Sequence, residues 1–305
     1  MNHNDYVLMT AAHDEERNIE GAIQSVLVQT ERPIRWVIVS DSSTDKTDQI
    51  IKSYAAKYSW IKYRRADRQL GRNFASKIMA LQLADQVLRG EQFSLIGNLD
   101  ADVTLDPGYF AGLLDQFRKD SSLGVASGFV YEESAGRYVS RPLNSDQSVP
   151  HAAQLMRRAC YESIGGYAVL KYGGEDWHAL VSARMKGWRA VAFPDLRILH
   201  HRHSGVGSGV IRGSFRAGRM DYSFGSYPPF ELLKCLRRLP TAHFTGGVVR
   251  MCGFLVGYLL REKRLVSAEF VKFLRDEQRE RVSAFVRRCL RLRKNREVYK
   301  CLIAP

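Results

Sequence analysis

Two aspartates separated by a single residue, Asp100 and Asp102, are well suited to hold a divalent cation. They follow an apolar run over residues 93–99 that has the character of a buried strand. In open α/β sheets, ligands bind beyond the carboxyl ends of the strands, and two carboxylates there can bind a hard cation that neutralises a diphosphate. The pair alone is a weak motif, because loops are rich in aspartate, and it could instead cap the chain ahead of Asp106.

A second acidic position, Asp41, ends another apolar run and is followed by hydroxyl residues and Asp45. We expect Asp41 to accept a hydrogen bond from a nucleobase. We expect Asp45 to cap the helix that begins near Thr47. The alternative is that both aspartates only cap.

A third acidic pair, Glu175 and Asp176, follows Gly173 and Gly174 and opens a helical pattern. Glycines let a backbone approach a ligand closely, and acidic side chains are favoured near a helix N-terminus. A carboxylate in this position can act as the general base for a sugar hydroxyl. An acidic helix cap explains the same residues equally well in isolation.

Two adjacent histidines, His200 and His201, directly follow an apolar segment over residues 196–199. Either could be a further protein ligand for a cation held by Asp102. Zinc is disfavoured, because no Cys or Glu accompanies them at metal-binding spacing. The glycine-rich residues 205–209 do not complete a G-x-G-x-x-G phosphate loop, and we interpret them as a flexible loop that could cover the site.

The elements that must position these side chains alternate between short apolar runs and helical stripes. Strand-like runs lie at residues 6–10, 36–39, 61–63 and 93–99, which predicts a parallel sheet wrapped by helices. Residues 123–194 are less regular, with strand-like runs at 125–131 and 190–193, and predict a mixed half. After Pro228 and Pro229 the sequence becomes helical and basic.

The composition is that of a folded protein with a basic C-terminal part. Of 305 residues, 45% are hydrophobic, the N-terminus has no secretory pattern, and the five scattered cysteines favour reduced thiols. The net charge is +14, and residues 261–305 carry 14 Lys/Arg against 6 Asp/Glu. Such a tail attracts nucleic acid or an anionic membrane, although a solvated basic helix is the simpler alternative.

Taken together, in this order and spacing, these motifs resemble the family 2 glycosyltransferases of the GT-A fold. Residues 12–19 (AHDEERNI) and 25–30 (SVLVQT) are similar to the family's opening signature, and residues 39–45 (VSDSSTD) to its V-D-D-x-S-T-D segment. Residues 71–77 resemble its diphosphate-side helix, residues 100–102 its D-x-D, and residues 175–176 its E-D pair. The resemblance covers residues 6–203.

The resemblance implies transfer from a nucleotide-diphosphate sugar, and it assigns six donor-binding residues: Ala12, Glu15, Asp41, Arg72, Lys77 and Asp100. The first three would line the nucleoside pocket. Arg72 and Lys77 would lie near the diphosphate, and Asp100 would face the ribose or donor sugar.

The same resemblance implies a metal-dependent, inverting reaction. Asp102, with His200 or His201, would hold Mn²⁺ or Mg²⁺. Asp176, with Glu175 as the other member of the pair, would deprotonate the acceptor, and a single displacement would need no covalent nucleophile.

Two positions depart from the family pattern. Asp14 stands where the family usually has Asn, and Ser40 where it usually has the first Asp of a pair. The identity of the bound base is therefore not predicted.

A looser resemblance continues downstream of the histidines, through Arg212, Phe215, Gly218, residues 221–222, Gly225 and Pro228. It is to bacterial exopolysaccharide and cell-envelope glycosyltransferases, whose acceptors are often lipid-linked saccharides on the inner membrane. The change of character after Pro228 and Pro229 places a domain boundary near Pro229, so we expect a GT-A catalytic domain over residues 1–229, with a donor half of about 1–103 and an acceptor half of about 104–229. A helical, basic region follows at 230–305.

The C-terminal region predicts contact with a membrane surface. Residues 251–260 form an uninterrupted apolar run, which is shorter than the ~20 residues that span a bilayer. Residues 265–289 place apolar side chains at helical intervals among Arg and Lys, which is typical of a helix lying in the interface. The alternative is packing against protein. We expect a cytoplasmic protein, peripheral on the inner face of the plasma membrane.

Two other classes of protein remain as alternatives. A nucleotidylyltransferase, or another sugar-nucleotide enzyme, would carry a glycine-rich N-terminal loop with a basic residue, whereas this chain has AAHDE at residues 11–15. A nucleic-acid-binding protein would show aromatics interleaved with Lys and Arg, or a helix–turn–helix, and the sequence shows neither. We therefore expect no nucleic-acid partner.

Overall fold

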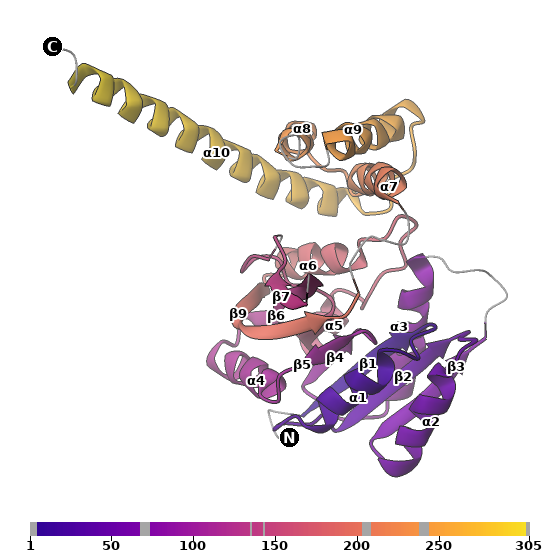
Figure 1. Cartoon of the computed structure of the whole chain (residues 1–305). Coiled ribbons are helices and arrows are strands. Elements are labelled where there is room, and N and C mark those ends of the chain that lie inside the picture. Colours follow the sequence, from indigo (N-terminus) through magenta and orange to yellow (C-terminus); the bar gives the residue numbers. More distant parts are fainter. Residues whose placement is uncertain are drawn as a thin grey trace. The chain divides into compact units, whose positions relative to one another are not determined.

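The computed structural model of the chain describes residues 5–67, 74–134, 136–142, 144–202, 209–237 and 244–302. The chain divides into two compact units, Met1–Ser204 and Gly205–Pro305 (Figure 1). The boundary expected near Pro229 falls inside the second unit, at the start of helix α8 (Pro228–Leu236). The reason is that α7 (Val210–Ser223) packs closely on α9 (Phe244–Leu259), where Gly218 contacts the backbone of Arg250.

The first unit begins with the predicted alternation of strands and helices. Its elements are β1 (Tyr6–Ala12), α1 (Ile19–Leu27), β2 (Arg35–Asp41), α2 (Thr47–Lys57), β3 (Ile61–Ala66), α3 (Phe74–Leu88) and β4 (Leu95–Leu99). Strands β3, β2, β1 and β4 are neighbours in this order and are all parallel. Their carboxyl ends therefore meet at one edge of the sheet, as the sequence predicts.

The second half of this unit completes a mixed sheet. It contains β5 (Val103–Leu105), α4 (Tyr109–Lys119), β6 (Leu123–Ser134), β7 (Arg137–Ser140), β8 (Ala153–Arg157), α5 (Arg158–Ser163), α6 (Glu175–Met185) and β9 (Arg189–His200). Over the described residues the sheet has nine strands, in the order β3-β2-β1-β4-β8-β6-β9-β5, and β7 pairs with β6. Strand β8 is antiparallel to both β4 and β6, which confirms the mixed α/β class.

The two apolar runs on either side of Pro194 form one strand, β9, instead of separate segments. Its pairing with β6 changes register between Gly128 and Phe129, where Gly128 pairs with Phe193 and Phe129 pairs with Arg197. A proline cannot donate to the sheet, and an irregularity of this kind lets the strand continue past it. The continuation carries His200 to the end of β9.

Apolar side chains pack on both faces of the sheet. In β1, Tyr6 and Leu8 join a core with α1, α2 and α4, whereas Val7 and Met9 join a core with α3, α5 and α6. This alternation follows from the two-residue period of a strand covered on both faces. The carboxyl ends of the strands are left as the place for ligands.

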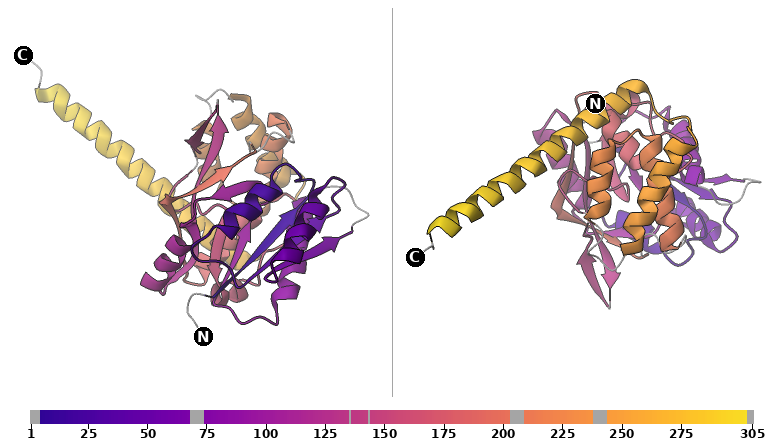
Figure 2. Two further views of the ribbon diagram at one scale, coloured as in Figure 1. Left: turned by 60° about the horizontal axis from the view of Figure 1, so that its bottom comes forward. Right: turned by 90° about the horizontal axis from the view of Figure 1, so that it is seen from above.

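The second unit is helical, and its fourth helix is α10 (Ala268–Leu302). The start of α10 packs on the turn between α7 and α8, where Gln278 accepts a hydrogen bond from the backbone N of Tyr227 (2.6 Å) and Arg275 donates to the carbonyl of Gly225 (2.8 Å). The rest of α10 extends beyond the other three helices (Figure 2). Within the described part of the chain, no helix combines the length and apolar character needed to cross a bilayer.

Candidate active site

The first aspartate of the D-x-D segment is paired with a lysine. Asp100 follows directly after β4, and its Oδ1 accepts hydrogen bonds from Lys77 Nζ (2.6 Å) and Asn98 Nδ2 (3.1 Å). Burial, the largest single effect, raises the pKa of the Asp100 carboxyl, but the charges of Lys77 and His151 and the hydrogen bonds from Lys77 and Asn98 together lower it below its ordinary value. Lys77, which the sequence places near a diphosphate, is in this structure the counter-ion of Asp100.

The second aspartate faces a histidine. His200 Nε2 lies 3.5 Å from Asp102 Oδ1, and both side chains are largely buried. The contact arises because β5, which begins directly after Asp102, pairs with the end of β9. Burial and the charge of Asp100 raise the pKa of Asp102 above its ordinary value. The site would therefore favour an added positive charge.

The two histidines have different surroundings. His201 uses both ring nitrogens, with Nε2 2.9 Å from Thr104 Oγ1 and Nδ1 2.9 Å from the Tyr138 hydroxyl. His200 turns its Nε2 toward Asp102, and its Nδ1 is buried without a hydrogen-bond partner. Of the two candidates, His200 has the better geometry for a ligand. The described side chains include no group of three His, Cys, Asp or Glu residues placed to hold a metal ion.

The residues expected at the nucleoside side lie at the ends of neighbouring strands. Ala12 ends β1, Asp41 ends β2, and these strands pair in parallel. Glu15 is buried in the loop after β1, and its Oε2 accepts a hydrogen bond from Arg202 Nη2 (2.9 Å). His13 Nδ1 lies 2.6 Å from the carbonyl of Asp41. The structure thus brings the three expected residues to one edge of the sheet.

Local hydrogen bonds hold the two loops at this edge together. Asp14 has a left-handed φ of 51°, which Asp and Asn tolerate best among residues with a side chain, and its Oδ1 accepts from the backbone N of Thr44 (2.7 Å). Asp45 accepts from the backbone N of Thr47 (2.9 Å) and of Glu16 (3.0 Å). Asp45 thus accepts from the first N–H of α2, but the N-cap position itself is occupied by Lys46, one residue later than predicted.

The predicted E-D pair begins helix α6. Gly173 and Gly174 have φ values of 80° and 87°, which glycine adopts without strain. Asp176 Oδ1 accepts a hydrogen bond from the next backbone N (2.7 Å). Burial, and then the charge of Asp176, raises the pKa of Glu175.

Lys77 connects the E-D pair to the D-x-D segment. Burial would lower the pKa of Lys77, but the charges of Asp100, Glu175 and Asp176 raise it above its ordinary value. Carboxylates separated by more than 70 residues of sequence therefore act on the same ammonium group. Arg72, the other basic residue expected here, and residues 203–208 lie outside the described residues.

The matches to known proteins agree with this geometry. The model of glycosyl transferase family 2 matches residues 7–172, which contain the loops after β1 and β2 and the D-x-D segment. The chain belongs to glycosyl transferase family 2. None of the curated proteins matches it in sequence.

Solved glycosyltransferase structures share the fold of this family 2 member. The mannosyltransferase PcManGT from Pyrobaculum calidifontis, in complex with GDP-Man and Mn²⁺, is 16% identical, with a TM-score of 0.56 over 88% of this chain and 78% of that chain. TarS 1-349 from S. aureus, in complex with UDP-GlcNAc, is 16% identical, with a TM-score of 0.53 over 72% and 65%. GalNAc-T7 with UDP, GalNAc and Mn²⁺ is 14% identical, with a TM-score of 0.54 over 83% and 55%. The GT-A fold is thereby established.

A layer of buried polar side chains near the D-x-D segment of this family 2 enzyme was not predicted from the sequence. Asn98 Nδ2 donates to the carbonyl of His151 (2.5 Å), and the Tyr167 hydroxyl donates to Gln154 Oε1 (2.7 Å). Burial, and then the charge of Lys77, lowers the pKa of His151 to about 3, so this ring is neutral. Asn98 could have been noticed as an amide inside an apolar strand, whereas no local pattern marks His151.

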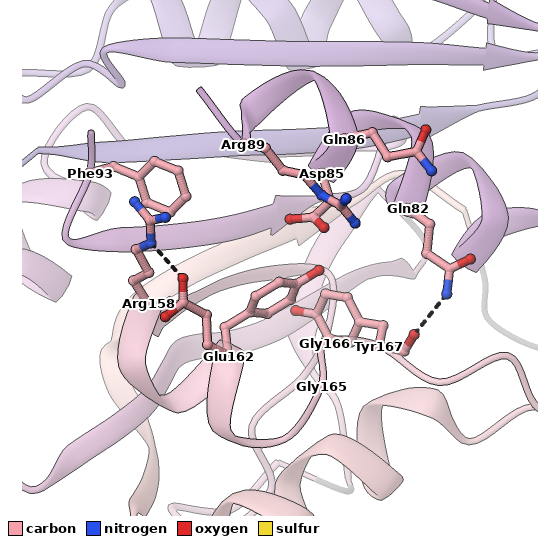
Figure 3. A pocket seen from close by; sticks show the side chains of 11 residues that line it. Gln82, Asp85, Gln86, Arg89, Phe93, Arg158, Glu162, Gly165, Gly166 and Tyr167 are labelled. Carbon is pink, nitrogen blue, oxygen red and sulfur yellow. Dashed lines mark hydrogen bonds and ion pairs between the residues drawn. The ribbon is translucent and has the colours of Figure 1, made fainter. Parts of the chain in front are cut away.

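A separate pocket of about 510 Å³ lies between α3 and α5 (Figure 3). It is lined by polar side chains of both helices, among them Gln82, Asp85 and Glu162, and by the loop at Gly165. None of the residues predicted for donor binding, metal binding or catalysis lines it.

Proposed function

We propose that this protein is an inverting glycosyltransferase that moves a sugar from a nucleotide-diphosphate donor to a hydroxyl of a saccharide or lipid-linked saccharide. Family membership supplies the reaction class. The observation that carries the assignment of the site is the ion pair of Lys77 with Asp100 (2.6 Å), together with the charges of Glu175 and Asp176, which also act on Lys77. Carboxylates for donor binding and for base catalysis then lie on the same side of the first unit.

For the donor, Ala12, Glu15 and Asp41 would line the nucleoside pocket, and Asp100 would face the ribose or the sugar. Their positions at the ends of β1, β2 and β4 support this assignment, because ligands of open α/β sheets bind there. Lys77 would add positive charge near the diphosphate while it pairs with Asp100.

For the cation, Asp102 and His200 would be the protein ligands. The residues fit Mn²⁺ or Mg²⁺ in charge, because burial and the charge of Asp100 raise the pKa of Asp102, and a bound cation would stabilise its carboxylate. His200 turns a ring nitrogen toward Asp102. PcManGT and GalNAc-T7 were both solved with Mn²⁺. The bound cation would neutralise the diphosphate of the donor.

For the chemistry, Asp176 would accept the proton of the acceptor hydroxyl. The hydroxyl oxygen forms a bond to the anomeric carbon as the bond from that carbon to the diphosphate oxygen breaks, and the diphosphate leaves with the electron pair. One such displacement inverts the anomeric centre. Asp176 is assigned as the base because residues 175–176 match the family's E-D pair, and Glu175 is the other candidate.

A thermal-shift panel of nucleoside diphosphates, with Mn²⁺ and with EDTA, tests this proposal. A ligand at 100 times its Kd stabilises the folded protein by roughly 2.7 kcal/mol. We expect one base to be preferred, and we expect Asp102→Asn to lose the Mn²⁺-dependent part of the shift. Asp106→Asn is the matched control, because Asp106 pairs with Arg197 at an exposed position. Equal shifts in Asp102→Asn and wild type would count against the cation site, and no shift with any nucleotide against the donor site.

We also propose that the second unit contacts the inner face of the plasma membrane, where envelope or exopolysaccharide acceptors are assembled. One face of α9 is apolar and exposed at Val248 (47%), Leu255 (56%) and Leu259 (80%), while Phe254 faces the helical core. Leu260 is also exposed, and basic residues follow at once with Arg261 and Lys263. Apolar contact and attraction to anionic lipid would then act at one place.

Co-sedimentation with vesicles tests the membrane proposal. We expect binding to anionic vesicles that weakens with salt and falls in the double variant Leu255→Gln/Leu259→Gln. The control is Val28→Gln/Ile34→Gln, which alters two exposed apolar residues of the first unit. Pelleting that is negligible, or equal with neutral and anionic vesicles, would contradict the proposal.

A further inference from the structure

A single arginine, Arg202, lies between Glu15 and Asp102 at the carboxyl ends of the strands. Arg202 comes two residues after the end of β9, and its Nη2 lies 2.9 Å from Glu15 Oε2. Its Nε lies 3.9 Å from Asp102 Oδ2. One guanidinium therefore faces both the residue expected at the nucleoside and the residue expected at the cation.

The two acids are held in place, whereas the arginine is accessible. The side chains of Glu15 and Asp102 are 9% and 14% exposed, and that of Arg202 is 43% exposed. Glu15 is fixed further by Asn18 Nδ2, which donates to Oε2 (3.0 Å), and by Thr47 Oγ1, which accepts from its backbone N (2.8 Å). Arg202 is the most exposed of the three side chains, so it is the member of this group that can shift away from Asp102.

The contact of Arg202 with Asp102 is the weaker of its two. A separation of 3.9 Å is too long for a hydrogen bond, whereas 2.9 Å to Glu15 is an ordinary one. Burial and Asp100 raise the pKa of Asp102, and the charges of His200 and Arg202 act in the opposite direction. Arg202 thus supplies part of the positive charge that Asp102 requires in the metal-free protein.

We propose that Arg202 is an internal counter-ion that competes with the divalent cation for Asp102. In the metal-free protein it neutralises Asp102 and Glu15 together, and it withdraws from Asp102 when the cation binds. The inference rests on the cation site of the proposed function. Arg202 is then a positioning residue. It stabilises the folded arrangement of Glu15 and Asp102 when no metal is bound, and it weakens metal binding.

Titration of the nucleotide-free protein with Mn²⁺, followed by the electron paramagnetic resonance signal of free Mn²⁺, tests the competition. Arg202→Gln removes one positive charge and a competing ion pair, so we expect Mn²⁺ to bind about three- to tenfold more tightly. Arg197→Gln is the matched control, since it lies five residues earlier in β9, removes the same charge and affects an arginine that pairs with the exposed Asp106. We expect the control to stay within about twofold of wild type. Arg202→Lys keeps the charge and should stay closer to wild type than Arg202→Gln.

Thermal unfolding gives a second readout that does not depend on activity. A coupling between two sites is reciprocal, so the loss of Arg202 should lower Tm more in EDTA than in saturating Mn²⁺. A variant that is merely misfolded would lose stability equally in both conditions and would not bind Mn²⁺ more tightly.

The outcomes separate this inference from the function on which it rests. If wild type binds Mn²⁺ and Arg202→Gln binds it equally or more weakly, the competition is overturned and the cation site stands. If neither protein binds Mn²⁺ up to millimolar concentration, the inference fails together with the cation site. Tighter binding in Arg202→Gln alone, with the larger Tm loss in EDTA, supports it.

Discussion

Replacing Lys77 by Met should destabilise the protein by about 1–2 kcal/mol, because Asp100 then keeps its burial and loses its counter-ion. Lys77 Nζ lies 2.6 Å from Asp100 Oδ1, and the two side chains are 32% and 22% exposed. Exposed ion pairs contribute about 0.2–1 kcal/mol, whereas breaking a fully buried pair costs about 3–5 kcal/mol. Solvent screens this pair, and Asp100 keeps its hydrogen bond from Asn98 (3.1 Å), so the free-energy cost of losing Lys77 should lie nearer the range for exposed pairs.

The destabilisation should depend on pH with a definite sign. In the folded protein, Lys77 lowers the pKa of Asp100 against the effect of burial. A carboxyl with a lowered folded pKa contributes stability above its unfolded pKa of about 3.9, and that stability is lost as pH falls through the folded value. The difference between wild type and Lys77→Met should therefore be complete at pH 7 and shrink in acid, as Asp100 takes up a proton.

A double-mutant cycle in urea isolates the pair. Wild type, Lys77→Met, Asp100→Asn and the double variant should give a coupling energy of about 1 kcal/mol, and Lys186→Met serves as a control at an exposed lysine. If the two substitutions add to within about 0.3 kcal/mol, the ion pair contributes nothing and the reasoning is refuted. A difference that persists undiminished in acid would refute it as well.

Two further changes test other parts of the chain. Asp176→Asn should keep nucleotide affinity and reduce transfer about 10²- to 10⁴-fold, measured as release of nucleoside diphosphate; turnover at the wild-type rate would transfer the base role to Glu175. Arg250→Met should destabilise the protein by about 3–5 kcal/mol in urea unfolding, because the buried Asp221 and Glu231 lose the guanidinium that both contact. A loss below 1 kcal/mol, no larger than that of a control substitution at an exposed arginine, would show that Lys234 suffices for both acids.

Several elements were predictable because they depend on neighbours in sequence. The apolar runs at residues 6–10, 36–39 and 93–99 specify strands β1, β2 and β4, and chain direction alone places the acidic residues at or just beyond their ends at the carboxyl edge. Gly174 before α6, with its left-handed φ, is likewise a local requirement of the helix start.

Other features depend on contacts between residues distant in the sequence, which no local sequence pattern indicates. The division of the chain between Ser204 and Gly205 follows from the packing of α7 on α9, and not from the composition change at Pro229. The neutral His151 beneath the D-x-D segment is likewise a product of burial by distant residues.

The sequence by itself determined the family, the parallel strands and the acidic residues at their ends, because motifs, apolar runs and chain direction are local properties. Only the tertiary structure decided which charges meet. His200 faces Asp102 and His201 does not, because β5 pairs with the end of β9. Arg202 contacts Glu15, which is 187 positions away in the sequence. Electrostatic partners are selected by distances in space, and those distances are set only when the distant strands of the sheet have paired.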